Sequence, residues 1–178
     1  MSKRASESSG VQTVATIGVY GFTAEAFIAA LEGADARAVL DVRQRRGVRG
    51  SEYAWANSLR LQAALRSAGI SYRHQPELAP TTELRLMQYR DDARLGVGKR
   101  SRTELAAEYR ERYTAEILDL VDLAAIVDTM AADGASVLLC VERDAEACHR
   151  SIIAARMAER HGVPVIHLGP PAPPRGPA

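Results

Sequence analysis

Two cysteines, a histidine and an arginine lie close together near the carboxyl end of the sequence. Cys140 follows an apolar run, and Cys148, His149 and Arg150 come at the expected start of a helix. The free N–H groups at a helix start bind anions and favour a thiolate, and an arginine can hold a phosphate through two hydrogen bonds. Glu142 can orient Arg150 or act as a general base. We therefore name Cys148, Glu142 and His149 as candidate catalytic residues and Arg150 as a candidate ligand-binding residue.

The same residues also have structural interpretations. Cys140 and Cys148 have the size and polarity of buried packing residues, and Arg150 can form an internal ion pair with Asp41 or Glu142. A metal site built from Cys140, Cys148 and His149 lacks the short ligand spacing of zinc motifs and an evident fourth ligand. We therefore predict no metal from the sequence.

A second polar segment begins with Asp41 and Arg43, directly after a buried apolar run. Arg45, Arg46 and Arg49 follow, and two aromatic residues come next. Arginines that hold phosphates and rings that stack on bases are typical of nucleotide and single-stranded nucleic-acid sites. We therefore predict that Asp41 and Arg43 bind ligand, and that the four arginines contact a nucleotide or nucleic acid. The alternative is a solvated basic loop.

Apolar runs of strand length alternate with helical patterns. Predicted strands cover 14–18, 38–42, 70–74, 136–141 and 163–167, and predicted helices cover 23–32, 55–68, 148–160 and two parts of 101–130. This alternation predicts an α/β domain: a three-layer, mainly parallel sheet with helices on both faces, Rossmann-like. Ligands bind such sheets at the carboxyl ends of the strands, so Gly18 and His74 join the candidate ligand-binding residues. The basic stretch 99–102, after a Gly-x-Gly, is expected to be a mobile loop.

Length and composition fit one folded domain. The chain has 178 residues, 47% of them hydrophobic, and its net charge of +1 gives no global sign of nucleic-acid binding. Residues 1–12 and the proline-rich residues 169–178 are predicted to be disordered tails around a single domain at 13–168. The sequence shows no secreted disulfide framework, membrane span or signal peptide, so we expect a cytoplasmic protein that does not bind a membrane.

Five segments of the chain resemble the domain-of-unknown-function family 488. They are 16–18, 41–43, 74–78, 138–142 and 148–151, and the most specific is the Cys-x-Glu strand end followed by Cys-His-Arg. The resemblance extends over about residues 13–168, and it implies an α/β domain with the same strand-end residues. It implies no reaction and no cofactor. The sequence departs from the family at Val19 and Tyr20, where histidine and serine are usual, and at 79–81, where a glycine-rich stretch is usual.

Three functions are compatible with these features. The leading one is binding of a phosphate-bearing ligand, a nucleotide or nucleic acid, at the carboxyl edge of the sheet. The second is a thiol-dependent enzyme of rhodanese-like sulfurtransferase type using Cys148 or Cys140, although the eight residues between Cys140 and His149 do not form a compact anion cradle. The third is a non-catalytic partner-binding module. The sequence contains no Walker loop, dinucleotide fingerprint or nucleophile elbow, so the cofactor and the oligomeric state stay unknown.

Overall fold

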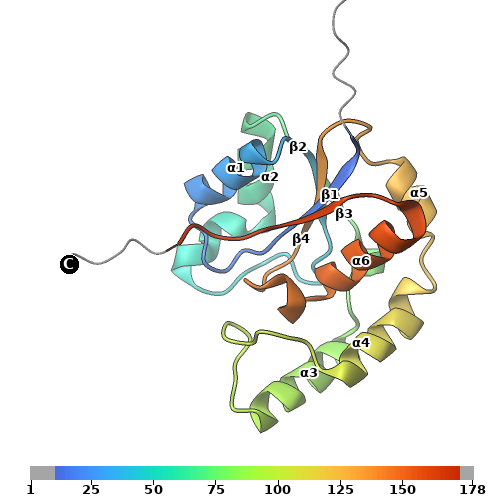
Figure 1. Ribbon diagram of the computed structural model, residues 1–178. Coiled ribbons are helices and arrows are strands. Elements are labelled where there is room, and N and C mark those ends of the chain that lie inside the picture. Colours follow the sequence, from blue (N-terminus) through green and yellow to red (C-terminus); the bar gives the residue numbers. More distant parts are fainter. Residues whose placement is uncertain (1–10, 173–178) are drawn as a thin grey trace, which may run out of the picture.

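The computed structural model describes residues 11–172, and these contain one parallel sheet of five strands. The strands are β1 (Thr13–Ile17), β2 (Ala36–Asp41), β3 (Ser71–His74), β4 (Ala135–Leu139) and β5 (Val165–Leu168), arranged in the order β3-β2-β4-β1-β5 (Figure 1). All four strand pairs are parallel. The carboxyl ends of the strands therefore meet at one edge of the sheet.

Helices cover both faces of the sheet. α1 (Ala24–Gly33) and α2 (Ser58–Ser67) lie on one side, and α5 (Leu123–Asp128) and α6 (His149–His161) lie on the other (Figure 1). All five residues of β4 are buried, and α6 buries Ile153 and Met157 against the sheet. The three-layer α/β prediction is confirmed. The strand order differs from the 3-2-1-4-5-6 order of dinucleotide-binding folds, because β4 lies between β2 and β1.

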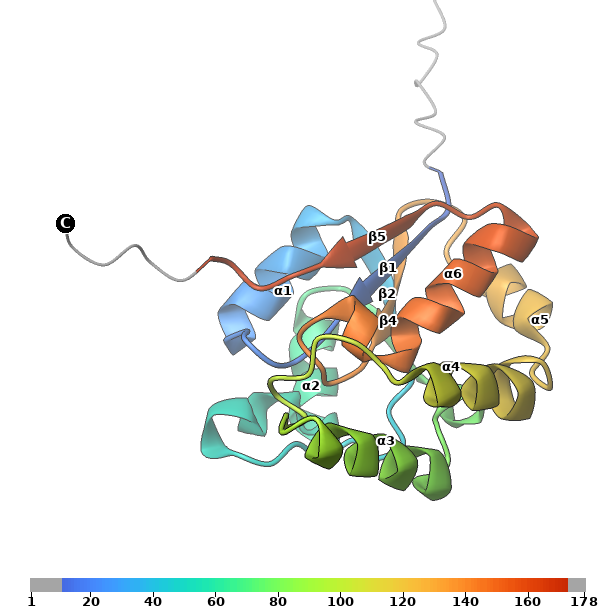
Figure 2. The ribbon, with the colours of Figure 1, turned by 60° about the horizontal axis from the view of Figure 1, so that its bottom comes forward.

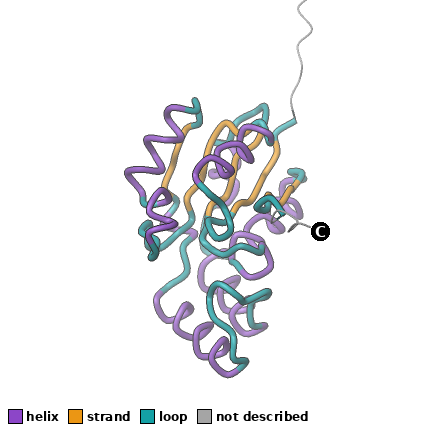
Figure 3. Tube along the Cα trace, turned by 90° about the vertical axis from the view of Figure 1, so that its left-hand side faces the viewer, coloured by secondary structure: helices purple, strands orange, loops and turns teal. Residues whose placement is uncertain are grey.

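α3 (Thr82–Arg94) and α4 (Ala107–Tyr113) form a helical pair beyond the carboxyl edge of the sheet. Figure 3 shows this pair projecting below the strands, and Figure 2 shows the two helices side by side. A π-helical turn (Thr114–Leu118) continues α4 toward α5. The connection at 95–106, between α3 and α4, runs back past the start of α6 (Figure 2).

The five predicted strands are present, with ends shifted by at most two residues. Thr23 caps α1, as predicted, by accepting a hydrogen bond from the backbone N–H of Ala26 at 3.2 Å. The predicted helix at 55–68 is instead a 3-10 segment (Ser51–Ala56) followed by α2. α3 was not predicted, because its buried positions include the polar residues Gln88 and Asp92 and leave no clear apolar stripe.

The predicted tails lie largely outside the described residues. Between residues 11 and 172, no helix has the length and apolar character needed to cross a bilayer.

Candidate ligand site at the carboxyl edge of the sheet

Asp41 and Arg43 form a buried ion pair at the end of β2. Arg43 donates from Nε and Nη2 to the two Asp41 oxygens at 2.9 and 2.7 Å, and from Nη1 to the Ala56 carbonyl at 2.9 Å. Tyr72 also donates to Asp41, at 2.6 Å. Asp41 is 0% and Arg43 2% exposed. The Arg43 donors are thus directed at the protein's own acceptors, and the pair fixes the start of the basic loop.

Arg150 is also turned inward. It is fully buried, and its Nη1 and Nη2 atoms donate to the backbone carbonyls of Glu142 and Arg143 at 2.7 and 3.0 Å. It pairs with neither Asp41 nor the Glu142 carboxylate. Gly18 lies against the same loop, because an added Cβ would stand 1.8 Å from the Glu142 carbonyl oxygen. Arg150 and Gly18 therefore shape the loop that carries Glu142.

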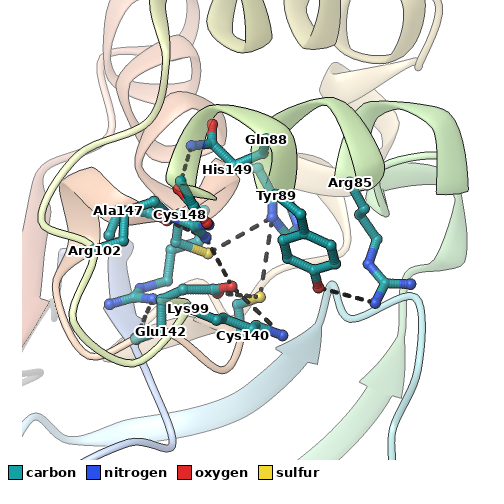
Figure 4. A network of polar contacts seen from close by, with 12 residues as sticks. Arg85, Gln88, Tyr89, Lys99, Arg102, Cys140, Glu142, Ala147, Cys148 and His149 are labelled. Atoms are coloured by element: carbon teal, nitrogen blue, oxygen red, sulfur yellow. Dashed lines mark hydrogen bonds and ion pairs between the residues drawn. The ribbon is translucent and has the colours of Figure 1, made fainter. Parts of the chain in front are cut away.

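Cys140, Cys148 and His149 meet where β4 ends and α6 begins. His149 Nδ1 lies 3.6 Å from Cys148 Sγ and 4.0 Å from Cys140 Sγ, as the dashed lines of Figure 4 show. His149 Nε2 contacts the Val42 carbonyl at 3.0 Å, which ties this group to the end of β2. Cys148 is the N-cap residue of α6. Both cysteines are free and buried, and the three donor atoms lie close enough together to hold one metal ion.

The surroundings shift the pKa values of these groups in opposite directions. Burial opposes ionisation of Cys148, but a hydrogen bond from Cys140 and the positive charges of His149 and Arg150 lower the Cys148 pKa well below its usual value. The same hydrogen bond and burial raise the Cys140 pKa well above its usual value. Burial lowers the His149 pKa, but the charge and hydrogen bond of Cys148, the charge of Glu142 and the Val42 carbonyl together outweigh it, so that the His149 pKa is raised. These shifts favour a Cys148 thiolate beside a protonated His149.

Glu142 connects this cluster to a group of cations. Its Oε2 atom lies 3.2 Å from Cys140 Sγ, and its Oε1 atom lies 3.3 Å from Arg102 and 3.7 Å from Lys99. Arg102 also pairs with Asp92 at 2.6 Å and donates to the Ala147 carbonyl. Burial lowers the Lys99 pKa, but the neighbouring acidic groups, Glu142 first among them, together outweigh it, so that the Lys99 pKa is raised. The stretch expected to be a mobile loop therefore contains a buried anchor, Arg102, and only its other residues remain partly or fully exposed.

A pocket of about 370 Å³ opens above these side chains. Its floor includes Cys140, Glu142, Cys148 and His149. Its remaining lining comes mainly from the connection between β1 and α1, the basic loop, α3, the 95–106 connection and α4, including the following residues: Tyr20, Arg43, Arg45, Arg49, Arg85, Tyr89, Lys99, Arg102 and Tyr109. Segments far apart in the sequence thus form one cavity at the carboxyl edge of the sheet. The polar residues at the strand ends predict a site at this edge.

Not every predicted site residue reaches this pocket. Arg43, Glu142, Cys148 and His149 line it, whereas Asp41 and Arg150 support it from behind. His74 contacts the Arg43 carbonyl at 3.0 Å, and Arg46 lies 3.5 Å from the Tyr72 hydroxyl, and neither is part of the lining. Sequence reasoning missed Arg85, Tyr89 and Lys99 as site residues. Only the basic character of 99–102 pointed toward one of them.

The fold and the site define an α/β protein with a cation-lined pocket over a buried pair of cysteines and a histidine. The family described as Domain of unknown function DUF488 matches residues 23–157, and the chain belongs to it. This match confirms the resemblance seen in the sequence. No curated protein and no solved structure matches the chain.

Proposed function

We propose that the protein binds a phosphate-bearing small molecule of nucleotide size in this pocket. The observation that carries the proposal is the charge of the lining. Six arginine and lysine side chains line the pocket, against the single carboxylate of Glu142. Such an excess of cations attracts anions. Removing these cations from water is costly unless an anion neutralises them.

Three of the six cations are available to a ligand. Arg43, Arg102 and Lys99 are paired with the buried carboxylates of Asp41, Asp92 and Glu142. Arg45 and Arg49 are exposed, and neither forms an ion pair within residues 11–172. Arg85 hydrogen-bonds only to the neutral side chains of Gln44 and Tyr89. Arginine forks hold phosphate oxygens through paired hydrogen bonds, so these side chains suit a ligand with one or two phosphates.

The size of the pocket and its aromatic side chains favour a nucleotide over inorganic phosphate. A volume of about 370 Å³ lies within the range of small-molecule sites. Tyr20 and Tyr89 contribute aromatic rings to the wall, and such rings stack on bases regardless of base identity. We therefore assign the phosphates to the basic side chains and a planar base to the tyrosines.

Calorimetric titration with ADP, GDP, CDP and UDP tests the proposal. We expect at least one of them to bind, and the Arg45→Ala/Arg49→Ala variant to lose on the order of tenfold in affinity or more, because each charge-assisted hydrogen bond contributes about 1.5–3 kcal/mol. The Arg60→Ala/Arg66→Ala variant on α2 removes the same charge elsewhere and should bind normally. Equal affinities in the two variants, or no binding, would contradict the proposal. Tighter binding of a single-stranded oligonucleotide would assign the site to nucleic acid instead.

A second candidate is thiol-dependent chemistry in the same pocket. The contact of His149 Nδ1 with Cys148 Sγ at 3.6 Å favours it, because a histidine in that position can accept the thiol proton. This candidate function requires a reducing, cytoplasmic location, in which both thiols stay free. Cys148→Ser would abolish turnover without weakening nucleotide binding. An unchanged turnover in Cys148→Ser would exclude Cys148 as the nucleophile.

A further inference from the structure

The donor atoms at the pocket floor are spaced as the ligands of one metal ion. Cys140 Sγ, Cys148 Sγ and His149 Nδ1 all lie within 4.8 Å of one another, and the two sulfur–nitrogen distances are 3.6 and 4.0 Å. Zinc bonds of about 2.3 Å to sulfur and about 2.0 Å to nitrogen, at tetrahedral angles, place sulfur and nitrogen about 3.6 Å apart. We infer that these three side chains bind a zinc ion, which goes beyond the proposed nucleotide binding.

The hydrogen bonding of His149 supports this role. Its Nε2 atom faces the Val42 carbonyl at 3.0 Å and donates to it, so that Nδ1 can present its lone pair to a metal beside the two sulfurs once metal binding has released the Nδ1 proton. Zinc-bound histidines usually donate their second N–H to a carbonyl or carboxylate in this way. The Tyr113 ring, 5.4 Å from the imidazole ring, packs against it and fixes its orientation. The imidazole is thus held in the geometry that ligation requires.

Glu142 lies beside the fourth coordination position. Its Oε2 atom is 3.2 Å from Cys140 Sγ, while Arg102 and Lys99 hold its Oε1 atom (Figure 4). Zinc sites that activate water keep three protein ligands and leave the fourth position open. In zinc deaminases, whose zinc can be held by one histidine and two cysteines, a neighbouring glutamate that is not a ligand carries the proton. Because Glu142 lines the pocket, the open position faces the space assigned to the nucleotide.

A divalent cation would also balance the charge that forms at the floor when both thiols ionise. Two thiols, an imidazole and a carboxylate are buried together, with exposed fractions of 6% for Cys140, 1% for Cys148, 4% for His149 and 7% for Glu142. Buried anions are costly unless they are paired or bind a metal. A divalent cation compensates both thiolates at once, and binding it releases the thiol protons.

The sequence does not reveal this site, because its ligands do not have the pairwise spacing of a zinc motif. Cys140 comes from the end of β4, whereas Cys148 and His149 come from the start of α6. The intervening loop folds back through the hydrogen bonds of Arg150 to the carbonyls of Glu142 and Arg143. Only the folded chain brings the three ligands together.

Titration of the metal-free, full-length protein with Co²⁺ and Zn²⁺ tests the inference. We expect one ion per chain, sulfur-to-cobalt charge-transfer bands, and the intense visible bands of a tetrahedral cobalt site. Cys140→Ser, Cys148→Ser and His149→Gln should each lower the affinity by about 100-fold or more, since the loss of an outer-shell partner alone costs 10–100-fold. His161→Gln, at an exposed histidine of α6, should bind as the wild type does.

A second measurement uses only the wild-type protein, so that it does not depend on whether the variants fold. In the wild-type protein, one equivalent of Zn²⁺ should protect both cysteines from alkylation by iodoacetamide, as read by mass spectrometry. Substoichiometric uptake of cobalt, or unchanged alkylation in the presence of zinc, would overturn the inference. Because the metal is added alone, failure of this test leaves the nucleotide titration unaffected.

Discussion

The buried arginines act on the protein itself. Arg43 and Arg150 donate to Asp41, Ala56, Glu142 and Arg143 and have almost no contact with solvent. Their positions at a strand end and in the first turn of a helix suggested ligand binding, since residue type and position are all that a sequence shows. The direction of a guanidinium depends on acceptors that only the tertiary structure supplies. The available cations of the pocket are therefore Arg45 and Arg49, which follow Arg43 in the basic loop, and Arg85 of α3.

The Arg43–Asp41 pair should contribute strongly to stability. Arg43→Ala leaves a buried carboxylate without its main partner, which costs about 3–5 kcal/mol of unfolding free energy. Arg37→Ala makes the same substitution at a half-exposed pair with Asp35 and should cost less than about 1 kcal/mol. Urea unfolding of both variants measures the difference. Similar losses would show that the buried pair has no special structural role.

Gly18 should be required for the loop that carries Glu142. Gly18→Ala places a Cβ 1.8 Å from the Glu142 carbonyl oxygen, so that the loop must move. Overpacking of this kind costs about 1–3 kcal/mol. Gly33→Ala, at the end of α1, meets no atom within 4 Å and should leave the melting temperature unchanged or slightly higher. A Gly18→Ala variant as stable as Gly33→Ala would contradict the close approach.

At the scale of the elements, the strands were predictable, whereas α3 and its side chains in the pocket lining were not. The strands are apolar runs that end in polar residues, and this pattern reflects burial on both faces of a parallel sheet. α3 buries Leu84 and Met87 beside Gln88 and Asp92, and these polar groups bond to each other and to groups outside the helix, such as Arg102. A local pattern cannot show such partners. Arg85 and Tyr89 of α3 were therefore missed.

Arg102 should hold the 95–106 connection over the pocket. It pairs with Asp92 and Glu142 and donates to the Ala147 carbonyl, which joins the connection to α3 and to the start of α6. Arg102→Ala should cost about 3–5 kcal/mol and speed amide hydrogen exchange in residues 95–106. Arg100→Ala removes a half-exposed partner of Glu52 in the same connection and should have a small effect. Unchanged exchange in Arg102→Ala would refute the anchoring role.

For the molecule as a whole, net charge conceals where charge is concentrated. The chain carries a net charge of +1, yet the pocket at the carboxyl edge of the sheet is lined by six cations and one carboxylate. The sequence pointed to the edge of the sheet at which this pocket lies, because parallel strands direct their carboxyl ends the same way. The number of cations at that edge depends on α3 and the 95–106 connection, which no strand-end rule places there.

A crystal structure with the most tightly bound nucleoside diphosphate tests the central claim most directly. The ligand-binding account predicts phosphate oxygens within hydrogen-bonding distance of at least two of the available cations, which are Arg45, Arg49 and Arg85. It also predicts that the base lies against Tyr20 or Tyr89. A diphosphate bound outside this pocket, or a pocket without ligand at saturating concentration, would contradict the claim.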